Sequence, residues 1–94
     1  MDIYKVELSK SAVKSLKKIP RRIIEKLFLW IDLVEHEGIR ESRRIKSFHD
    51  EPLKGKRKGQ RSIRLSGQYR AIYIELDNGK YEFIEIQEIN AHEY

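Results

Sequence analysis

Three strand-like runs follow one another in the C-terminal half of the sequence, and they constrain the fold more than any other feature. The runs are RSIRLS, YRAIYIEL and YEFIEIQEI, at residues 61–66, 69–76 and 81–89. Gly67-Gln68 joins the first two runs, and the tetrapeptide DNGK at residues 77–80 joins the last two. Because Asn-Gly is a strong hairpin signal and short connections allow only antiparallel pairing, the runs predict a three-stranded antiparallel meander.

The N-terminal segment DIYKVEL, residues 2–8, alternates polar and apolar side chains. This period of two is typical of a strand with one apolar face, to which the alternation assigns Tyr4, Val6 and Leu8. The segment therefore predicts a fourth strand.

Two helices are predicted between this strand and the meander. Ser9 or Ser11 can cap the first helix, and its apolar side chains run at helical spacing up to Pro20. Pro20 is expected to open the second helix, because proline at the first helical position loses no hydrogen bond. Gly38 is placed to end that helix in a left-handed conformation. A wide apolar stripe follows the second helix, and its Trp30 is expected in the core; the stripe comprises Ile23, Ile24, Leu27, Phe28, Trp30, Ile31 and Val34.

These elements predict a single α+β domain over residues 1–94 with the order β-α-α-β-β-β. We expect an antiparallel-rich sheet with both helices antiparallel to each other on one face and the other face free. The connector at residues 39–60 is strongly charged and shows no sustained period.

Positive charge is concentrated in the middle of the chain. Residues 40–70 hold 11 Lys and Arg against three acids, a net charge of +8, whereas the remainder holds 9 basic and 12 acidic residues, a net charge of −3. A positive field of this kind favours a polyanion as partner. The absence of cysteine excludes a disulfide framework and a thiolate zinc site. The apolar runs are too short for a membrane span and the N-terminus has no signal-peptide pattern, so we expect a soluble cytoplasmic protein without membrane contacts.

Histidines and carboxylates stand close to this basic region. His49 and His92 each lie next to carboxylates just outside a regular element, whereas His36 falls on the polar side of the second helix. No metal site is predicted from His49, Asp50, Glu51 and His92, because their spacing matches no ligand pattern and the positive field repels cations.

The set instead suits acid-base cleavage of RNA through its own 2′-hydroxyl. That reaction needs a base, an acid and fixed cations against the charge on the phosphate. Glu51 and His92 can supply the base and the acid, and Tyr94 can stack on a nucleobase. The cations can come from Lys54, Arg61, Arg64 and Arg70, arginine being favoured because its fork meets two phosphate oxygens.

The segment DEPLKGKRKGQRSIRLSGQYRAIYIE, residues 50–75, resembles the central motif of the RelE/ParE toxin superfamily, especially its YoeB and HigB branches. The shared pattern is a PLKG turn, a Gly, a short strand, and a second strand that opens with an aromatic residue and Arg. The resemblance implies a small toxin that a cognate antitoxin neutralises and that cuts mRNA in the ribosomal A site, without a cofactor, as a monomer or weak dimer outside the antitoxin complex.

The resemblance also implies roles for individual residues. Glu51 before PLKG resembles the YoeB-type general base, and Arg70 resembles the arginine that stabilises the phosphate. His92 and Tyr94 resemble the terminal acid and orienting aromatic, although Glu93 separates them here. His49 resembles a HigB histidine but stands two residues further from PLKG. RNA contacts are expected from His49, Lys54, Lys56, Arg57, Lys58, Arg61 and Arg64.

Two other functions remain open at the sequence level. One is a ParE-like inhibitor of DNA gyrase, which binds a protein and has no catalysis of its own. The other is a non-catalytic relative that binds RNA or sequesters an antitoxin. Glu51 together with the terminal His92 and Tyr94 favours the nuclease, because a gyrase binder has no use for acid-base groups.

Overall fold

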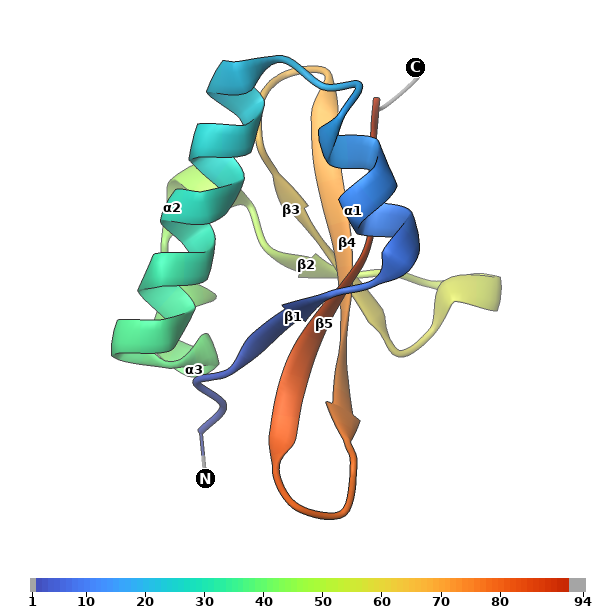
Figure 1. Cartoon of the computed structure of the whole chain (residues 1–94). Helices are drawn as coiled ribbons and strands as arrows, with labels where there is room; N and C mark the ends of the chain where they lie inside the picture. The colour runs from blue at the N-terminus through green and yellow to red at the C-terminus, as the bar shows by residue number, and fades with distance from the viewer. Residues whose placement is uncertain (1, 92–94) are drawn as a thin grey trace.

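The computed structural model describes residues 2–91. Its elements in chain order are β1 (Val6–Leu8), α1 (Lys10–Leu16), α2 (Arg21–Glu37), α3 (Ile39–Ser42), the 3₁₀ turn η1 (Lys46–Phe48), β2 (Glu51–Pro52), the 3₁₀ turn η2 (Gly55–Arg57), β3 (Gln60–Arg64), β4 (Tyr69–Asp77) and β5 (Glu82–Ala91). Figure 1 shows α1 and α2 in front of the sheet. The α+β class and the β-α-α-β-β-β order are confirmed, and α3 and β2 are additions that the sequence period did not predict.

The five strands form one sheet in the order β1-β5-β4-β3-β2. Strands β3, β4 and β5 make the predicted antiparallel meander, and β2 extends it at one edge as a further antiparallel strand. At the other edge β1 pairs parallel with β5. Parallel pairing needs a long crossover connection, and the intervening helices provide one.

The first strand is shorter than predicted, and its apolar face differs. Tyr4 is 52% exposed, whereas Ile3 is buried in the core with its carbonyl accepting a hydrogen bond from the Ile39 N–H. The prediction that Tyr4 lies on the apolar face was therefore wrong. Pairing with β5 begins only at Val6, and hydrogen bonds to the start of α3 hold the residues before it.

Capping residues set the start of each long helix. The Ser9 hydroxyl accepts a hydrogen bond from the Ala12 N–H and donates one to the Gln87 carbonyl, so the predicted cap also anchors α1 to the sheet. Gln87 is the extra residue of a bulge, since Ile72 pairs with Glu88 and Tyr73 pairs with Ile86. Pro20 occupies the N-cap of α2 and not its first helical position, a difference of one residue.

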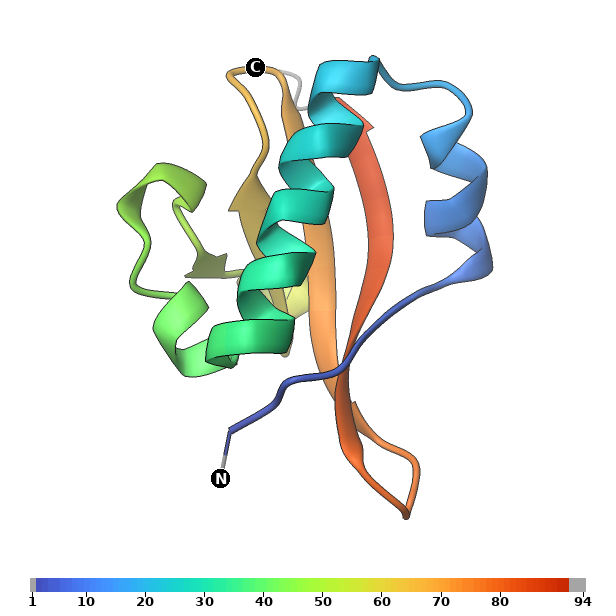
Figure 2. The same cartoon turned by 60° about the vertical axis from the view of Figure 1, so that its left-hand side comes forward.

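The apolar stripe of α2 packs on the sheet and forms the core (Figure 2). Trp30 is fully buried, as predicted, and its ring lies 5.1 Å from that of Tyr73 on β4. Phe28 is 43% exposed, so the stripe is narrower than predicted. Within residues 2–91, no helix is long and apolar enough to span a membrane.

Gly38 joins α2 to α3 and has a φ of +87°. The predicted helix end and positive φ are confirmed, but its ψ of 160° lies outside the left-handed helical well. A Cβ at this position would clash with the Asp2 carboxylate. Asp2 itself accepts hydrogen bonds from the backbone N–H groups of Ile3 and Arg40. This close approach sets where α3 begins.

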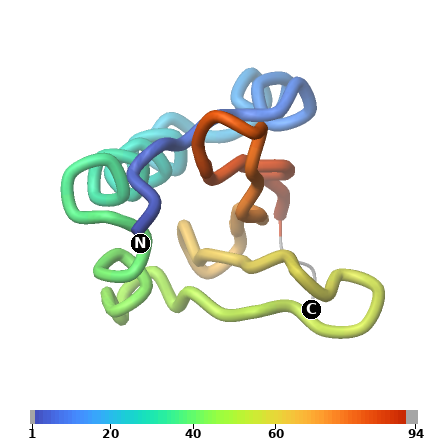
Figure 3. Tube along the Cα trace, turned by 90° about the horizontal axis from the view of Figure 1, so that it is seen from below, coloured from blue at the N-terminus to red at the C-terminus, as the bar shows by residue number. Residues whose placement is uncertain are grey.

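Both long helices lie on one face of the sheet. Figure 3 shows α1 and α2 on that side, with the yellow-green segment that holds β2 at the edge of the sheet beside β3. Alternation along β3 and β4 agrees with this view. Ile63 and Ala71 join the core under the helices, so their neighbours Arg64 and Arg70 project from the opposite face.

Candidate functional site

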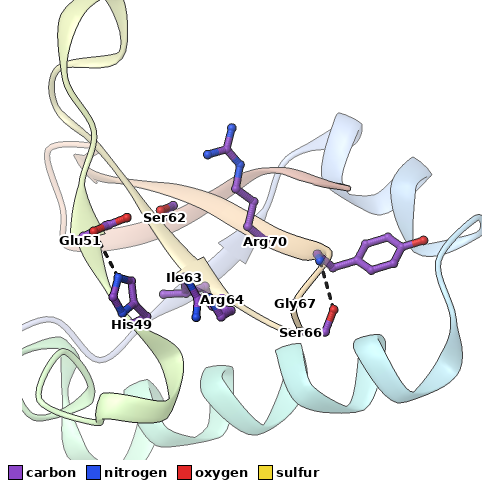
Figure 4. Close-up of a pocket in the computed structure, with 9 residues that line it drawn as sticks. His49, Glu51, Ser62, Ile63, Arg64, Ser66, Gly67 and Arg70 are labelled. Atoms are coloured by element: carbon purple, nitrogen blue, oxygen red, sulfur yellow. Dashed lines mark hydrogen bonds and ion pairs between the residues drawn. The ribbon is translucent and has the colours of Figure 1, made fainter. Parts of the chain in front are cut away.

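A shallow pocket, open to solvent, lies beside the end of β3. It is built by the segment that precedes β2, by β3, by the turn after β3 and by the start of β4 (Figure 4). Its lining residues are His49, Glu51, Ser62, Ile63, Arg64, Ser66, Gly67, Tyr69 and Arg70. Both signs of charge are present in this one pocket.

His49 and Glu51 form one side of the pocket. The His49 Nε2 atom lies 3.4 Å from the Glu51 Oε2 atom, and both side chains are a little over half exposed. His49 adopts a left-handed conformation with a φ of +46°. This conformation is uncommon for a residue other than glycine and places the imidazole beside the carboxylate.

The basic side of the pocket comes from Arg64 and Arg70. These residues are direct cross-strand partners on β3 and β4. The Arg70 Nε is buried, and it has no hydrogen-bond partner among residues 2–91. Buried donors are usually satisfied, so a guanidinium held in this state beside a pocket is suited to an acceptor that arrives with a ligand.

Between His49 and Glu51, the Asp50 side chain points into the protein and is completely buried. Its Oδ1 accepts a hydrogen bond of 2.8 Å from the Arg61 Nε, and its Oδ2 accepts one of 2.7 Å from the Tyr73 hydroxyl. Arg43 on the far side donates to the Tyr73 hydroxyl and to Glu75. Burial, with the Asp50 charge beside it, raises the pKa of Tyr73 well above its usual value of 10.0.

The basic loop after β2 is tied back to the sheet. Arg57 Nη1 donates to the Gln60 side chain and lies 3.0 Å from a Glu88 carboxylate oxygen on β5. Lys56 and Lys58 are exposed, and neither has an ion-pair partner in the described part of the chain. The loop therefore presents its lysine charges while Arg57 fixes its position.

Solved structures share this arrangement of helices and strands over nearly their whole length. E. coli YafQ superposes with a TM-score of 0.72 at 19% identity, covering 94% of this chain and 92% of that chain. A chain of the archaeal RelE–RelB complex from Pyrococcus horikoshii gives 0.67 at 27% identity, covering 94% and 93%. A YoeB/ParE toxin from Agrobacterium tumefaciens gives 0.65 at 24% identity, covering 95% and 99%. The chain therefore has the fold of the RelE/ParE-like toxin superfamily.

The superfamily assignment rests on three-dimensional structure. The sequence matches no known family model and no curated protein sequence. The predicted resemblance to RelE/ParE toxins is confirmed at the level of the fold.

On this RelE/ParE-like scaffold, the predicted site residues fall into four groups. His49, Glu51, Arg64 and Arg70 meet in the pocket. The loop cations Lys54, Lys56, Arg57 and Lys58 do not line it, and Arg61 turns to the helical side of the sheet to pair with Asp50. His92 and Tyr94 lie outside the described residues.

Sequence reasoning missed three parts of the site. Tyr69 and the Ser66 turn line the pocket, and the Ser66 hydroxyl accepts a hydrogen bond from the Tyr69 N–H. Alternation could have found Ser62, which shares a strand face with Arg64. The Asp50 network had no sequence signal, since its members come from segments far apart in the chain.

Among residues 2–91, no group of three or more His, Asp or Glu side chains is placed to hold a metal ion.

Proposed function

We propose that this chain is a toxin of a type II toxin–antitoxin pair that cleaves mRNA on the ribosome. The observation that carries the proposal is the meeting of Glu51 and Arg70 in one open pocket, with His49 and Arg64 beside them. A carboxylate base and fixed guanidinium groups are two of the three kinds of group that the cleavage of a phosphodiester by its own 2′-hydroxyl requires, the third being an acid.

In the proposed reaction Glu51 removes the proton from the RNA 2′-hydroxyl. The 2′-oxygen then attacks the adjacent phosphorus, and the bond from phosphorus to the 5′-oxygen breaks. Arg70 and Arg64 stabilise the charge that builds on the non-bridging oxygens, because guanidinium forks bind two of them at once. The products are a 2′,3′-cyclic phosphate and a free 5′-hydroxyl.

The leaving 5′-oxygen needs a proton, and we assign this role to His92. Ala91, the last residue of β5, pairs with Tyr69 of the pocket. His92 follows Ala91 directly in sequence, which supports its assignment to this site. We assign Tyr94 to nucleobase stacking, because an aromatic ring can stack on a base.

The proposed partners follow from charge and from the solved neighbours. Exposed lysines on the loop after β2 are available for ribosomal and messenger RNA phosphates, and the net charge of +5 favours such polyanions. The P. horikoshii neighbour is a RelE–RelB complex, and another is the E. coli DinJ–YafQ toxin–antitoxin complex. We therefore propose a cognate antitoxin as the protein partner, and a cytoplasmic location.

Primer extension on a reporter mRNA, with and without ribosomes, tests the proposal directly. We expect new 5′ ends with ribosomes and none with naked mRNA or with Glu51→Gln. Cleavage of naked mRNA would show that the reaction does not require the ribosome. Absence of cleavage in both, together with inhibition of gyrase supercoiling, would favour the ParE-like alternative.

A further inference from the structure

The segment that carries Glu51 alternates between the interior and the pocket. Phe48 is buried and Asp50 has a fully buried side chain, whereas His49 and Glu51 are a little over half exposed and line the pocket. Figure 4 shows His49 and Glu51 on the same side of this segment, joined by a dashed line. Phe48, which precedes His49, and Asp50, which lies between His49 and Glu51, therefore anchor the two pocket residues to the interior.

Asp50 is held more firmly than the residues on either side of it. Its two carboxylate oxygens each accept a hydrogen bond, one from Arg61 at 2.8 Å and the other from Tyr73 at 2.7 Å. The Tyr73 hydroxyl in turn accepts one from the Arg43 Nε at 3.1 Å. Every donor in this chain of contacts is itself fixed on a strand or next to α3, so Asp50 has little freedom.

The backbone on either side of Asp50 would not by itself hold the Glu51 side chain in the pocket. His49 has a φ of +46°, which disfavours a residue with a Cβ, and β2 is only the two residues Glu51 and Pro52. Proline lacks a backbone N–H, so this short strand contributes few ladder hydrogen bonds. Strained conformations persist where the surroundings over-determine them, and Phe48 and Asp50 are the anchored neighbours here.

We propose that Asp50 is a positioning residue that fixes Glu51 in the pocket through its hydrogen bonds to Arg61 and Tyr73, a role that rests on the nuclease function proposed above. Asp50 lies on the opposite side of the backbone from the reacting groups and does not touch the substrate. Its carboxylate sets the direction of the adjacent Cα, and the Glu51 carboxylate follows. A general base displaced by about 1 Å loses much of its rate advantage.

Backbone order at Glu51 tests the proposal without any need for catalysis. We expect the amide order parameter of Glu51 to fall from about 0.85 to about 0.6 in Asp50→Asn and in Tyr73→Phe. Tyr73→Phe keeps the aromatic ring against Trp30, so it decides the test if Asp50→Asn does not fold. The control is Ser42→Ala, which removes a buried hydrogen bond from the end of α3 to the carbonyl of its N-cap residue Gly38 and does not touch Asp50. An unchanged order parameter in a folded Asp50 or Tyr73 variant would overturn the proposal.

Single-turnover cleavage separates positioning from simple loss of folded protein. A positioning role lowers the rate constant, by about tenfold, with the reaction amplitude and the half-saturating ribosome concentration retained. A purely structural role lowers the amplitude at an unchanged rate constant, and that result in both variants would also overturn the proposal. Ser42→Ala should stay within about twofold of wild type. If wild type itself does not cleave RNA, the proposed function fails, and the order parameter alone decides whether Asp50 fixes Glu51.

Discussion

Arg64 on β3 and Arg70 on β4 lie directly opposite each other, and both side chains line the same pocket. Like charges at directly opposite positions of a sheet are destabilising, by up to about 1 kcal/mol relative to a neutral pair. Since the buried Arg70 Nε has no partner among residues 2–91, the pair is better suited to hold an anion than to hold the strands together. In the mechanism proposed above, a phosphate bound between them would turn this repulsion into shared attraction.

The first prediction follows from this repulsion. Arg64→Gln should raise the free energy of unfolding of the free protein by about 0.5 kcal/mol at low salt, and the gain should shrink at high salt as screening increases. The same change should weaken RNA binding. Urea denaturation at two salt concentrations checks it, with Arg22→Gln on exposed α2 as a control that removes the same charge away from the pocket. A loss of stability in Arg64→Gln would mean that Arg64 has a structural partner instead.

The second prediction concerns the general base. Glu51→Gln should lower the single-turnover cleavage rate by at least about 10²-fold, because an amide cannot accept the 2′-hydroxyl proton. Thermal stability should change little, since the contact to His49 is 3.4 Å long and exposed. His92→Gln should cause a similar loss of rate. Glu25→Gln on the exposed face of α2 serves as the control. A cleavage rate equal to that of the wild type in Glu51→Gln would show that Glu51 is not the general base.

The third prediction separates the cations of the basic loop. Replacing Lys56 and Lys58 together by glutamine should reduce the dependence of log affinity on log salt, by about one slope unit for each phosphate that the variant no longer neutralises. Arg57→Gln should change the slope less, because its charge is already paired with Glu88, but it should loosen the loop. Ribosome binding over a range of salt concentrations measures both slopes. Equal slopes for the wild type and the double lysine variant would show that these lysines are only solvated surface.

The elements were predictable because their signals are local. Asn78-Gly79 specified the hairpin, Ser9 specified the start of α1, and the spacing around Trp30 specified the buried face of α2. The strand β2 and the helix α3 were missed because each is too short to show a period. Tyr4 was misplaced because alternation extends only as far as the strand's own ladder.

The site was predictable only in part, for a related reason. Glu51 and Arg70 stood out because their residue types suit phosphate chemistry. Arg61 has the same residue type as Arg64, yet it faces Asp50, since strand alternation sends residues 61 and 64 to opposite faces. The partners of Asp50 are up to 23 residues away in sequence, so no local pattern reveals them.

The fourth prediction is an alkaline loss of stability that depends on Tyr73. Burial raises the pKa of the Tyr73 hydroxyl above its usual value of 10.0, and the neighbouring Asp50 charge acts in the same direction. Above that pH the unfolded chain releases the proton while the folded chain keeps it, so the free energy of unfolding falls as pH rises. Tyr73→Phe should be less stable than wild type at neutral pH, and the difference should narrow above about pH 10. Urea denaturation at several pH values checks this, and a constant difference would contradict it.

The last prediction is that lysine cannot replace Arg70. Arg70 is fixed on both sides, since it pairs with Arg64 on β3 and with Asn90 on β5. A guanidinium held in this way can bind two oxygens of a phosphate with little reorganisation, which contributes on the order of 3 kcal/mol, or about 10²-fold in rate. Arg70→Lys keeps the charge but loses the fork.

A structural role for Arg70 predicts a different pattern. If Arg70 served mainly as an ion pair within the sheet, lysine would retain most of the stability and most of the activity. We expect thermal stability close to wild type with a large loss of single-turnover rate, measured on programmed ribosomes. Arg22→Lys provides the matched control for the same chemical change on an exposed helix. If cleavage by Arg70→Lys stays within a few-fold of wild type, Arg70 does not stabilise the transition state, and the pocket would need another group to do so.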